Sequence, residues 1–493
     1  MSSRGLRCAA LAALIGLCLT SGGCGRSALR PSPDGSTLRS TWRDPSGAGA
    51  LAVAAGEALR DRTDLAPASR PERTLATFAE LCDTHLVDAE SPARVTFLNR
   101  LGPPFQSTFR PQETLDSRVL DGTVRSINAL GPQAVIEGGD LIDNDQADEL
   151  GRALAVLRGG LVREDSGAPG YAGVQSSRDG DPFYYRPGVD APRHPGLLAV
   201  ATSPFQAVGL RSPWFPVLGN HDALVAGEIA ASPATQREAV GRRAIWTLPS
   251  GLSSSSPSER LAAPLVGRLL SRLRGADAVS VAPDATRREL SPAQTLARLR
   301  AASGQGGRGA LLDYTFDVGP SVRAIVLDLV RRDSGSGGLV RPRQVAWLSA
   351  ALRAAGRRWV LVISHQPLPQ ATDGAAAMAL LDHDPHVLAL LSAHTHRNHI
   401  QARRTPAGGM WLISTSSGAD FPQQARAFRL MATPHGVALQ TWMLDHAPEP
   451  AGNVARELAY LDARGGRPQG FSGFAQDRNV TLYRSSARGP RGG

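Results

Sequence analysis

Two histidines stand two positions apart in the stretch LLSAHTHRN, residues 390–398, directly after an apolar run that is typical of a buried strand. The chain has only 11 histidines in 493 residues, so the pairing of His394 and His396 asks for a chemical reason. Imidazole binds divalent transition metals and exchanges protons near neutral pH. Taken alone, the stretch favours a chance pair in a surface turn, and other residues must decide between the two interpretations.

Carboxylate, amide and imidazole side chains follow four other apolar runs of the chain. In chain order they are Asp83, His85, Asp140, Asn220, His221, Asp222 and His365. In an open α/β sheet, ligands bind beyond the carboxyl ends of the strands. Five strand ends would therefore carry polar groups to one rim, and five of the 11 histidines fall in these turns. This coincidence argues against a chance pair and predicts a metal or catalytic site.

Strand-like and helix-like patterns alternate along the chain, which predicts an α/β fold. Strands are expected in residues 74–82, 134–140, 214–222, 322–330, 357–368, 386–396 and 409–417, and then in a hairpin of 428–433 and 437–444. Helices are expected in 117–130 and 343–356. Pro216 predicts a sheet edge or a strand start for its run.

Other regions interrupt or flank this pattern. Residues 1–24 predict a signal peptide, and 25–70, rich in Ser, Pro, Gly and Ala, predict a tether with one short helix near 56–64. The main domain is expected to span 71–450, with loop insertions near 160–212 and 223–311, and 451–493 to form a C-terminal extension packed on it.

An aromatic run of Phe183, Tyr184 and Tyr185 lies in the first insertion and has two open interpretations. It would stack a base or sugar of a substrate, or it would form a hydrophobic cluster under a long loop.

Five short motifs carry the polar groups: DTH (83–85), GGDLIDN (138–144), GNHD (219–222), SHQP (364–367) and AHTH (393–396). In order and approximate spacing they resemble those of the calcineurin-like metallophosphoesterases, over residues 72–445. Ala393 stands where glycine is usual, and the long interval between Asp222 and His365 marks an insertion. The resemblance implies a four-layer α/β/β/α sandwich of two mixed sheets, with the site at one rim.

The resemblance also implies a pair of divalent cations that share one bridging carboxylate, that of Asp140. The other ligands of one cation would be Asp83, His85 and His396. Those of the second cation would be Asn220, His365 and His394. Nitrogen and oxygen ligands without thiolate suit Mn, Fe, Zn or Co and discriminate little among them.

Neighbouring residues complete the expected site. The family gives His221 the role of general acid, and Asp222 is expected to orient it by hydrogen bonding, with a solvent-facing carboxylate as the alternative. Asp143 and Asn144 are expected to cap the following helix or to line the site, and the cap is favoured. Cys82 is expected to be a buried strand residue and not a ligand.

The leading functional hypothesis is hydrolysis of phosphate monoesters or diesters by a hydroxide that bridges two metals. The substrate would be a phosphorylated small molecule or an envelope phosphate. The alternative is a non-catalytic, envelope-binding lipoprotein on the same scaffold. Such a protein would lack a ligand or His221, and none is missing from this sequence.

The N-terminus resembles a bacterial lipoprotein signal, with Arg4 and Arg7, an apolar stretch and then Cys24, although Ser21 stands where leucine is usual. Export to the cell envelope is expected, with a membrane anchor at Cys24 or, without lipidation, as a periplasmic or secreted protein. The formal charge is +10, but every basic residue is a scattered arginine, so no nucleic-acid partner is expected. The sequence leaves the oligomeric state open.

Overall fold

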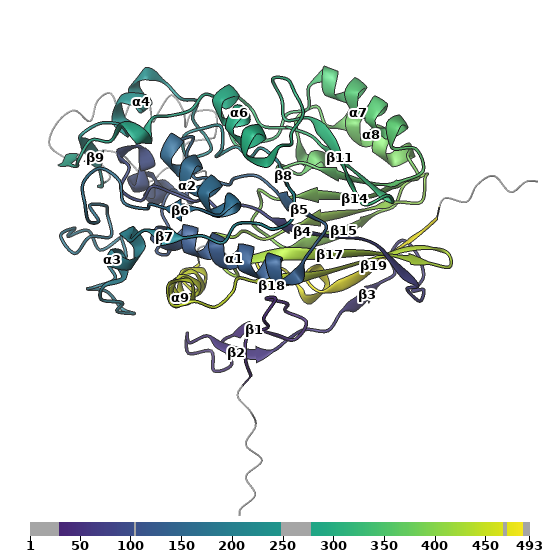
Figure 1. The fold of residues 1–493 in the computed structure, drawn as a ribbon, viewed down its shortest axis with the longest axis horizontal. Coiled ribbons are helices and arrows are strands. Elements are labelled where there is room, and N and C mark those ends of the chain that lie inside the picture. The colour runs from purple at the N-terminus through teal and green to yellow at the C-terminus, as the bar shows by residue number, and fades with distance from the viewer. Residues whose placement is uncertain (1–28, 103–104, 248–277, 467–470, 487–493) are drawn as a thin grey trace, which may run out of the picture.

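Two large β-sheets lie face to face between groups of helices in the computed structural model, which describes residues 29–102, 105–247, 278–466 and 471–486 (Figure 1). One sheet has seven strands and the other has six. Both sheets mix parallel and antiparallel pairs. The predicted α/β sandwich is confirmed, whereas the expected signal peptide and Cys24 lie outside the described residues.

The seven-stranded sheet takes its strands from both ends of the chain. Its order is β3 (Arg60–Arg62), β19 (Val480–Ser485), β18 (Gly436–Asp445), β17 (Gln424–Thr433), β4 (Arg73–Leu81), β5 (Ala134–Glu137) and β8 (Trp214–Pro216). β4, β5 and β8 are parallel, so their carboxyl ends share one edge of the sheet. β8 is the edge strand, which is the position that Pro216 predicts.

The six-stranded sheet comes from the second half of the chain. Its order is β11 (Tyr314–Val318), β12 (Val322–Val326), β13 (Trp359–Ile363), β14 (Val387–Ser392), β16 (Met410–Ser414) and β15 (His399–Arg403). The four central strands from β12 to β16 are parallel, so their carboxyl ends also share an edge. Residues that directly follow strands of the two sheets can therefore meet at one rim.

Helices cover the outer faces of both sheets. α1 (Asp116–Leu130) packs against β18. α2 (Ala147–Arg158) and α9 (Pro450–Arg464) both contact α1 (Figure 1). α7 (Pro342–Ala355) packs on β12 and β13 and also contacts α8 (Ala375–His383). The spacing of Val119, Leu120, Val124 and Ile127 puts them on the buried face of α1, as predicted.

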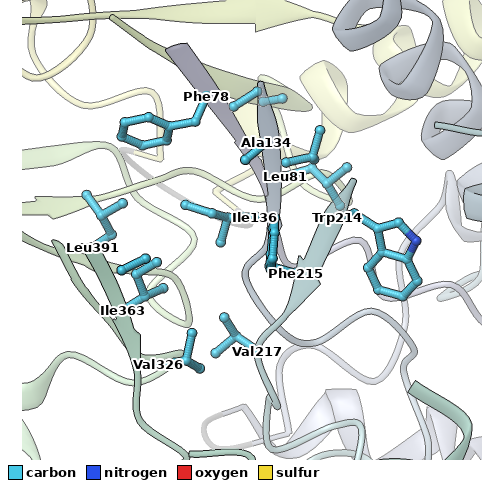
Figure 2. Close-up of a cluster of buried hydrophobic side chains, with 14 of the residues drawn as sticks. Phe78, Leu81, Ala134, Ile136, Trp214, Phe215, Val217, Val326, Ile363 and Leu391 are labelled. Atoms are coloured by element: carbon cyan, nitrogen blue, oxygen red, sulfur yellow. The ribbon is translucent and has the colours of Figure 1, made fainter. Parts of the chain in front are cut away.

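The core fills the space between the sheets, because side chains alternate along each strand. Figure 2 shows Ile363 and Leu391 from the six-stranded sheet facing Phe78 and Ile136 from the seven-stranded sheet. Val360 and Val362 of β13 belong instead to the hydrophobic cluster under α7 and α8. Each such side chain, when fully buried, contributes roughly 1.5–3 kcal/mol.

The tether expected in residues 25–70 is wrong for its described part. β1 (Ser40–Arg43) pairs with β2 (Ala52–Ala55), and β3 lies where a helix near 56–64 was expected and pairs with β19. The Thr37 backbone N–H donates to the Met443 carbonyl at 3.0 Å, and its hydroxyl lies 3.1 Å from Asn479 Oδ1. Hydrogen bonds to residues that are distant in the sequence therefore hold this part of the chain in place.

The second insertion is only partly an insertion. Residues 223–247 and 278–311 contain α4 (Pro233–Ala239), β9 (Arg243–Ile245), β10 (Ala278–Ser280) and α6 (Pro292–Ser303), and 248–277 lie outside the described residues. Leu296 and Leu299 of α6 belong to the main core. The expectation that this region contributes no core element is wrong, because its arginine-rich composition hides an apolar helix face.

The first insertion contains only short elements: β6 (Leu161–Val162), α3 (Leu197–Thr202) and β7 (Phe205–Gln206). The C-terminal residues supply α9 and β19, and β19 is a full strand of the seven-stranded sheet. None of the helices in the described part of the chain combines the length and the apolar character needed to span a bilayer.

Candidate metal centre

The predicted ligands meet at the rim where the strands of both sheets end. Each follows the carboxyl end of β4, β5, β8, β13 or β14, and the set is Asp83, His85, Asp140, Asn220, His365, His394 and His396. All are buried except His394, which is half-buried. The ligand atoms of Asp83, His85, Asp140 and His396 lie within 4.8 Å of one another, and so do those of Asp140, His365 and His394.

The turns that carry these groups have an unusual backbone. Five ligand residues adopt a left-handed conformation, with φ of 48° at Asp83, 45° at His85, 51° at Asp140, 64° at His394 and 55° at His396. For residues other than glycine this conformation costs on the order of 1–3 kcal/mol and gathers at functional sites. The rest of the fold therefore holds these turns against their local preference.

The first group brings two imidazoles and two carboxylates together. His396 Nε2 lies 3.4 Å from Asp83 Oδ1, and His85 Nε2 lies 3.8 Å from Asp140 Oδ2. The two Nε2 atoms are 3.1 Å apart. Both rings use their Nδ1 atoms elsewhere, His85 on Asp143 at 3.0 Å and His396 on Asp420. Their Nε2 atoms are thus turned toward the same point.

The second group shares Asp140. His365 Nε2 lies 3.1 Å from Asp140 Oδ2, and its Nδ1 donates to the Gly138 carbonyl at 2.9 Å. Asn220 donates through Nδ2 to the Gly227 carbonyl at 3.1 Å, so Oδ1, which accepts from Gln366 Nε2 at 3.3 Å, is the amide's ligand atom. His394 completes the group, with its ring 5.2 Å from that of His365. Asp140 is therefore placed as the expected bridge requires.

The chemistry of these donors fits two divalent cations. Asp83 Oδ2 is buried without a hydrogen-bond partner among the described residues, which is costly unless a cation or water satisfies it. Burial and then His221 lower the pKa of His85 to about 3, and burial and then His365 lower that of His394 to about 3. Both rings are therefore neutral, as metal ligation requires.

Asp140 is anionic without help from a metal. Burial opposes its ionisation, but His365 and His221 beside it hold its pKa well below the usual range. The same contact works in reverse on His365, whose pKa Asp140 raises to about 10 against the effect of burial. Before metal enters, this pair is a carboxylate and an imidazolium, so binding a cation at His365 must displace a proton.

His221 lies at the rim with one ring nitrogen committed. Its Nδ1 donates to the Asp143 carbonyl at 2.8 Å, and its backbone N–H donates to Asp140 Oδ1 at 2.8 Å. Its ring stands edge-on to that of His85, with centroids 4.4 Å apart. Nε2 is therefore the nitrogen able to exchange a proton with a substrate.

Asp222 does not orient His221, so that expectation is wrong. Its Oδ2 accepts from the backbone N–H groups of Asp140 at 3.0 Å and Gly219 at 2.8 Å, and its Oδ1 from those of Leu141 and Ile142. Burial, and then the charge of Asp140, raise its pKa to about 7. Asp222 fastens the turn after β5 to the turn after β8.

Asp143 lines the site and does not cap α2. Its carboxylate lies between His85 and Arg94, whose Nη1 is 3.3 Å away. Asn144 does not cap the helix either. Its Oδ1 accepts from the Ala226 N–H at 2.9 Å, and its own N–H donates to Glu149 at 2.7 Å. The favoured cap is therefore wrong for both residues.

Two site residues were missed in the sequence, Asp420 and Arg110. Asp420 follows β16 in the polar run STSSGAD, which is a weak signal of a sixth strand end at the rim. Arg110 has no local signal, and its partner Asp420 lies 310 positions away.

Cys82 is buried, as expected, with Sγ toward the carbonyls of Thr415 and Ser416, but it lies one residue beyond the end of β4 and is not part of the strand. Tyr184 is fully buried against Phe109 and donates its hydroxyl to the Trp246 carbonyl at 2.5 Å. Because Tyr184 presents no face to solvent, the interpretation as a stacking surface is wrong for it, and the hydrophobic cluster holds.

No known family's profile matches the sequence, and no curated protein matches it. Solved structures similar to this chain include a dimetal phosphatase from Danio rerio, with a TM-score of 0.38 and 14% identity over 76% of this chain and 98% of its own. A purple acid phosphatase from yellow lupin seeds has a TM-score of 0.36 and 10% identity over 85% of this chain and 56% of its own.

A sulfate thiohydrolase from Thermus thermophilus, solved with glycerol, has a TM-score of 0.29 and 15% identity over 80% of this chain and 61% of its own. At these TM-scores and identities, the similar structures provide no evidence about the chemistry of the rim. That chemistry is inferred from the side chains of this protein alone.

Proposed function

We propose that this protein hydrolyses phosphate esters with the help of two divalent cations held at the rim. The observation that carries the proposal is the position of Asp140, whose Oδ2 lies 3.1 Å from His365 Nε2 and 3.8 Å from His85 Nε2. One carboxylate thus serves two ligand groups. Two cations bound there would neutralise charge on the phosphoryl group and lower the pKa of the water that attacks phosphorus.

The protein's own groups would hold and move protons around that phosphoryl group. His221 has its Nδ1–H on the Asp143 carbonyl, so Nε2 is the atom that would give a proton to the departing oxygen. Such general acid catalysis contributes typically about 10²–10⁴-fold. The hydrogen bond from its backbone N–H to Asp140 Oδ1 would hold His221 beside the carboxylate that would bridge the two cations.

The test is a panel of chromogenic phosphomonoester and phosphodiester substrates. The purified protein should hydrolyse at least one of them with Mn²⁺, lose the activity in EDTA and regain it when Mn²⁺ is returned. Hydrolysis that persists in metal-free protein would overturn the dimetal proposal. Failure on both substrates with two metals bound would overturn the enzymatic one.

We further propose that the protein is exported and meets a phosphorylated small molecule or an envelope phosphate. The support is the charged, apolar and then SGGC order of residues 1–24, in which Cys24 is the site of lipidation. The native chain should fractionate with membranes, and Cys24→Ser should release it or block its maturation. A soluble wild-type protein cleaved at another residue would exclude lipidation and leave ordinary secretion.

A further inference from the structure

The histidines of the first ligand group are held by carboxylates that themselves share a contact. His85 Nδ1 is bonded to Asp143 Oδ1, and His396 Nδ1 is bonded to Asp420 Oδ2. Asp143 follows β5 and Asp420 follows β16, so they belong to different sheets and have no covalent reason to keep a fixed separation. What lies between them decides whether the two imidazoles stay aimed at one point.

Arg110 lies between these two carboxylates. Its Nε donates to Asp420 Oδ1 at 2.8 Å and its Nη2 to Asp420 Oδ2 at 3.3 Å, while Nη1 lies 3.7 Å from Asp143 Oδ1. The side chain is only 6% exposed, so solvent screens these contacts little. The planar guanidinium presents its donors in a rigid fork, which fixes direction as well as distance.

The second ligand group has no comparable support. His365 is held by the backbone carbonyl of Gly138, and the ring of His394 makes no hydrogen bond within the described residues. The contacts of Arg110 therefore support only the histidines of the first ligand group, His85 and His396. They do not involve the histidines of the second group. This asymmetry separates a specific role of Arg110 from general stabilisation of the fold.

We propose that Arg110 is a positioning residue that sets the affinity of one cation position by locking His85 and His396 together through Asp143 and Asp420. This rests on the proposed dimetal function. Outer partners of ligating histidines typically change metal affinity by about 10–100-fold when they are lost. Arg110→Met should weaken one of two cation-binding constants by that amount and leave the other within about threefold.

The experiment is a Co²⁺ titration of the metal-free, full-length protein. Calorimetry and the visible absorption of bound cobalt are its two readouts. Arg110→Met should lose the tighter or the weaker of two wild-type transitions selectively, with an altered cobalt spectrum for that position. Arg110→Lys should recover part of the affinity, because lysine keeps the charge and loses the fork.

Arg287→Met is the matched control, since Arg287 is also buried and donates through Nε to Asp88 at 2.9 Å without touching a proposed ligand. It should lower thermal stability and leave both cobalt constants unchanged. If Arg110→Met does not fold, Asp420→Asn replaces it, because this change keeps the shape and removes the charge that faces both His396 and Arg110.

The outcomes separate the two proposals. Two unchanged constants in folded Arg110→Met, or in Asp420→Asn where that variant replaces it, would overturn the positioning role and leave the dimetal function standing. Equal weakening of both constants would also overturn it, because the contacts predict a selective effect. A wild-type protein that binds no Co²⁺ would overturn the dimetal function, and the role of Arg110 with it.

Discussion

Asp222 accepts a hydrogen bond from the backbone N–H of Asp140 at 3.0 Å, and this contact ties the turn that carries the proposed bridging carboxylate to the neighbouring turn. Three further backbone N–H groups donate to the same side chain. The backbone of Asp140 has φ of 51°, which it would not adopt unaided. Asp222 therefore supplies part of the free energy that holds the turn of Asp140, a candidate metal ligand, in place.

Replacement of Asp222 by Asn should destabilise the protein and reduce its metal content together. In the wild type these backbone N–H groups donate to a carboxylate. In the variant some of them would face the amide nitrogen, which cannot accept, and leaving buried donors unpaired costs about 1–3 kcal/mol each. Chemical denaturation and metal analysis of the purified variant measure both effects. Asp317→Asn is the control, since Asp317 forms exposed ion pairs that are worth at most about 1 kcal/mol. Equal unfolding free energies for Asp222→Asn and wild type would contradict this role.

Replacement of Asp140 by Ala should abolish nearly all turnover and remove the interaction between the two cations. The carboxylate belongs to both ligand groups, so neither position keeps its full set of donors. Metal analysis should fall from two equivalents per chain, and in Mn²⁺-loaded protein the magnetic coupling between the ions should vanish. A variant that retains two coupled ions would show that another residue is the bridge.

The sequence could predict that the candidate ligands gather at one rim, because they sit in short motifs that directly follow apolar strands. Each motif needs only local information, namely a strand, a turn and a ligand. The partners of those ligands were harder to predict. Asp420 and Arg110 are separated by 310 positions, and their contact exists only once both sheets have formed.

The errors share a physical cause. Residues 40–62 carry too little apolar pattern to predict strands, and they form strands because β2 and β19 offer hydrogen bonds to their edges. The burial of Tyr184 likewise depends on Phe109 and Trp246, which approach from distant segments. Asp222 was assigned to its chain neighbour His221, whereas three of the four backbone N–H groups that donate to it lie 80 to 82 positions away.

Replacement of Tyr184 by Phe should lower stability by about 0.5–1.5 kcal/mol, the net contribution of one hydrogen bond, and leave KM unchanged. The variant keeps the ring that packs on Phe109 and removes the hydroxyl that donates to the carbonyl of the half-buried Trp246. Thermal unfolding and steady-state kinetics on the best substrate measure the two quantities. Tyr185→Phe is the comparison, because its hydroxyl bonds to the Pro192 carbonyl in a half-buried position and should cost less. A several-fold rise in KM for Tyr184→Phe at unchanged stability would return this residue to the substrate.

Glu90 should make the free energy of unfolding fall as pH rises, so that the protein becomes less stable. Burial, and then the charge of Asp88, raise its pKa to about 8 from an ordinary 4.5. Below 4.5 both states hold the proton. Between 4.5 and 8 the unfolded chain releases it first, so stability declines by up to about 1.4 kcal/mol per pH unit. In denaturation at a series of pH values, Glu90→Gln should remove this decline and gain on wild type toward pH 8. Parallel curves for the two proteins would show that Glu90 does not titrate in this way.

Replacement of His221 by Asn should cost more on some substrates than on others. A general acid matters in proportion to how poorly the departing oxygen leaves without a proton. Nitrophenolate leaves well unaided, whereas an alkoxide such as a glycerol oxygen does not. His221→Asn should therefore slow alkyl phosphate esters by about 10²–10⁴-fold and nitrophenyl esters far less. Metal content should be nearly unchanged, because the ring nitrogen of His221 bonds to the Asp143 carbonyl and not to a proposed cation. Equal losses on both substrate types, with metals and fold retained, would mean that His221 holds the turn in place and donates no proton.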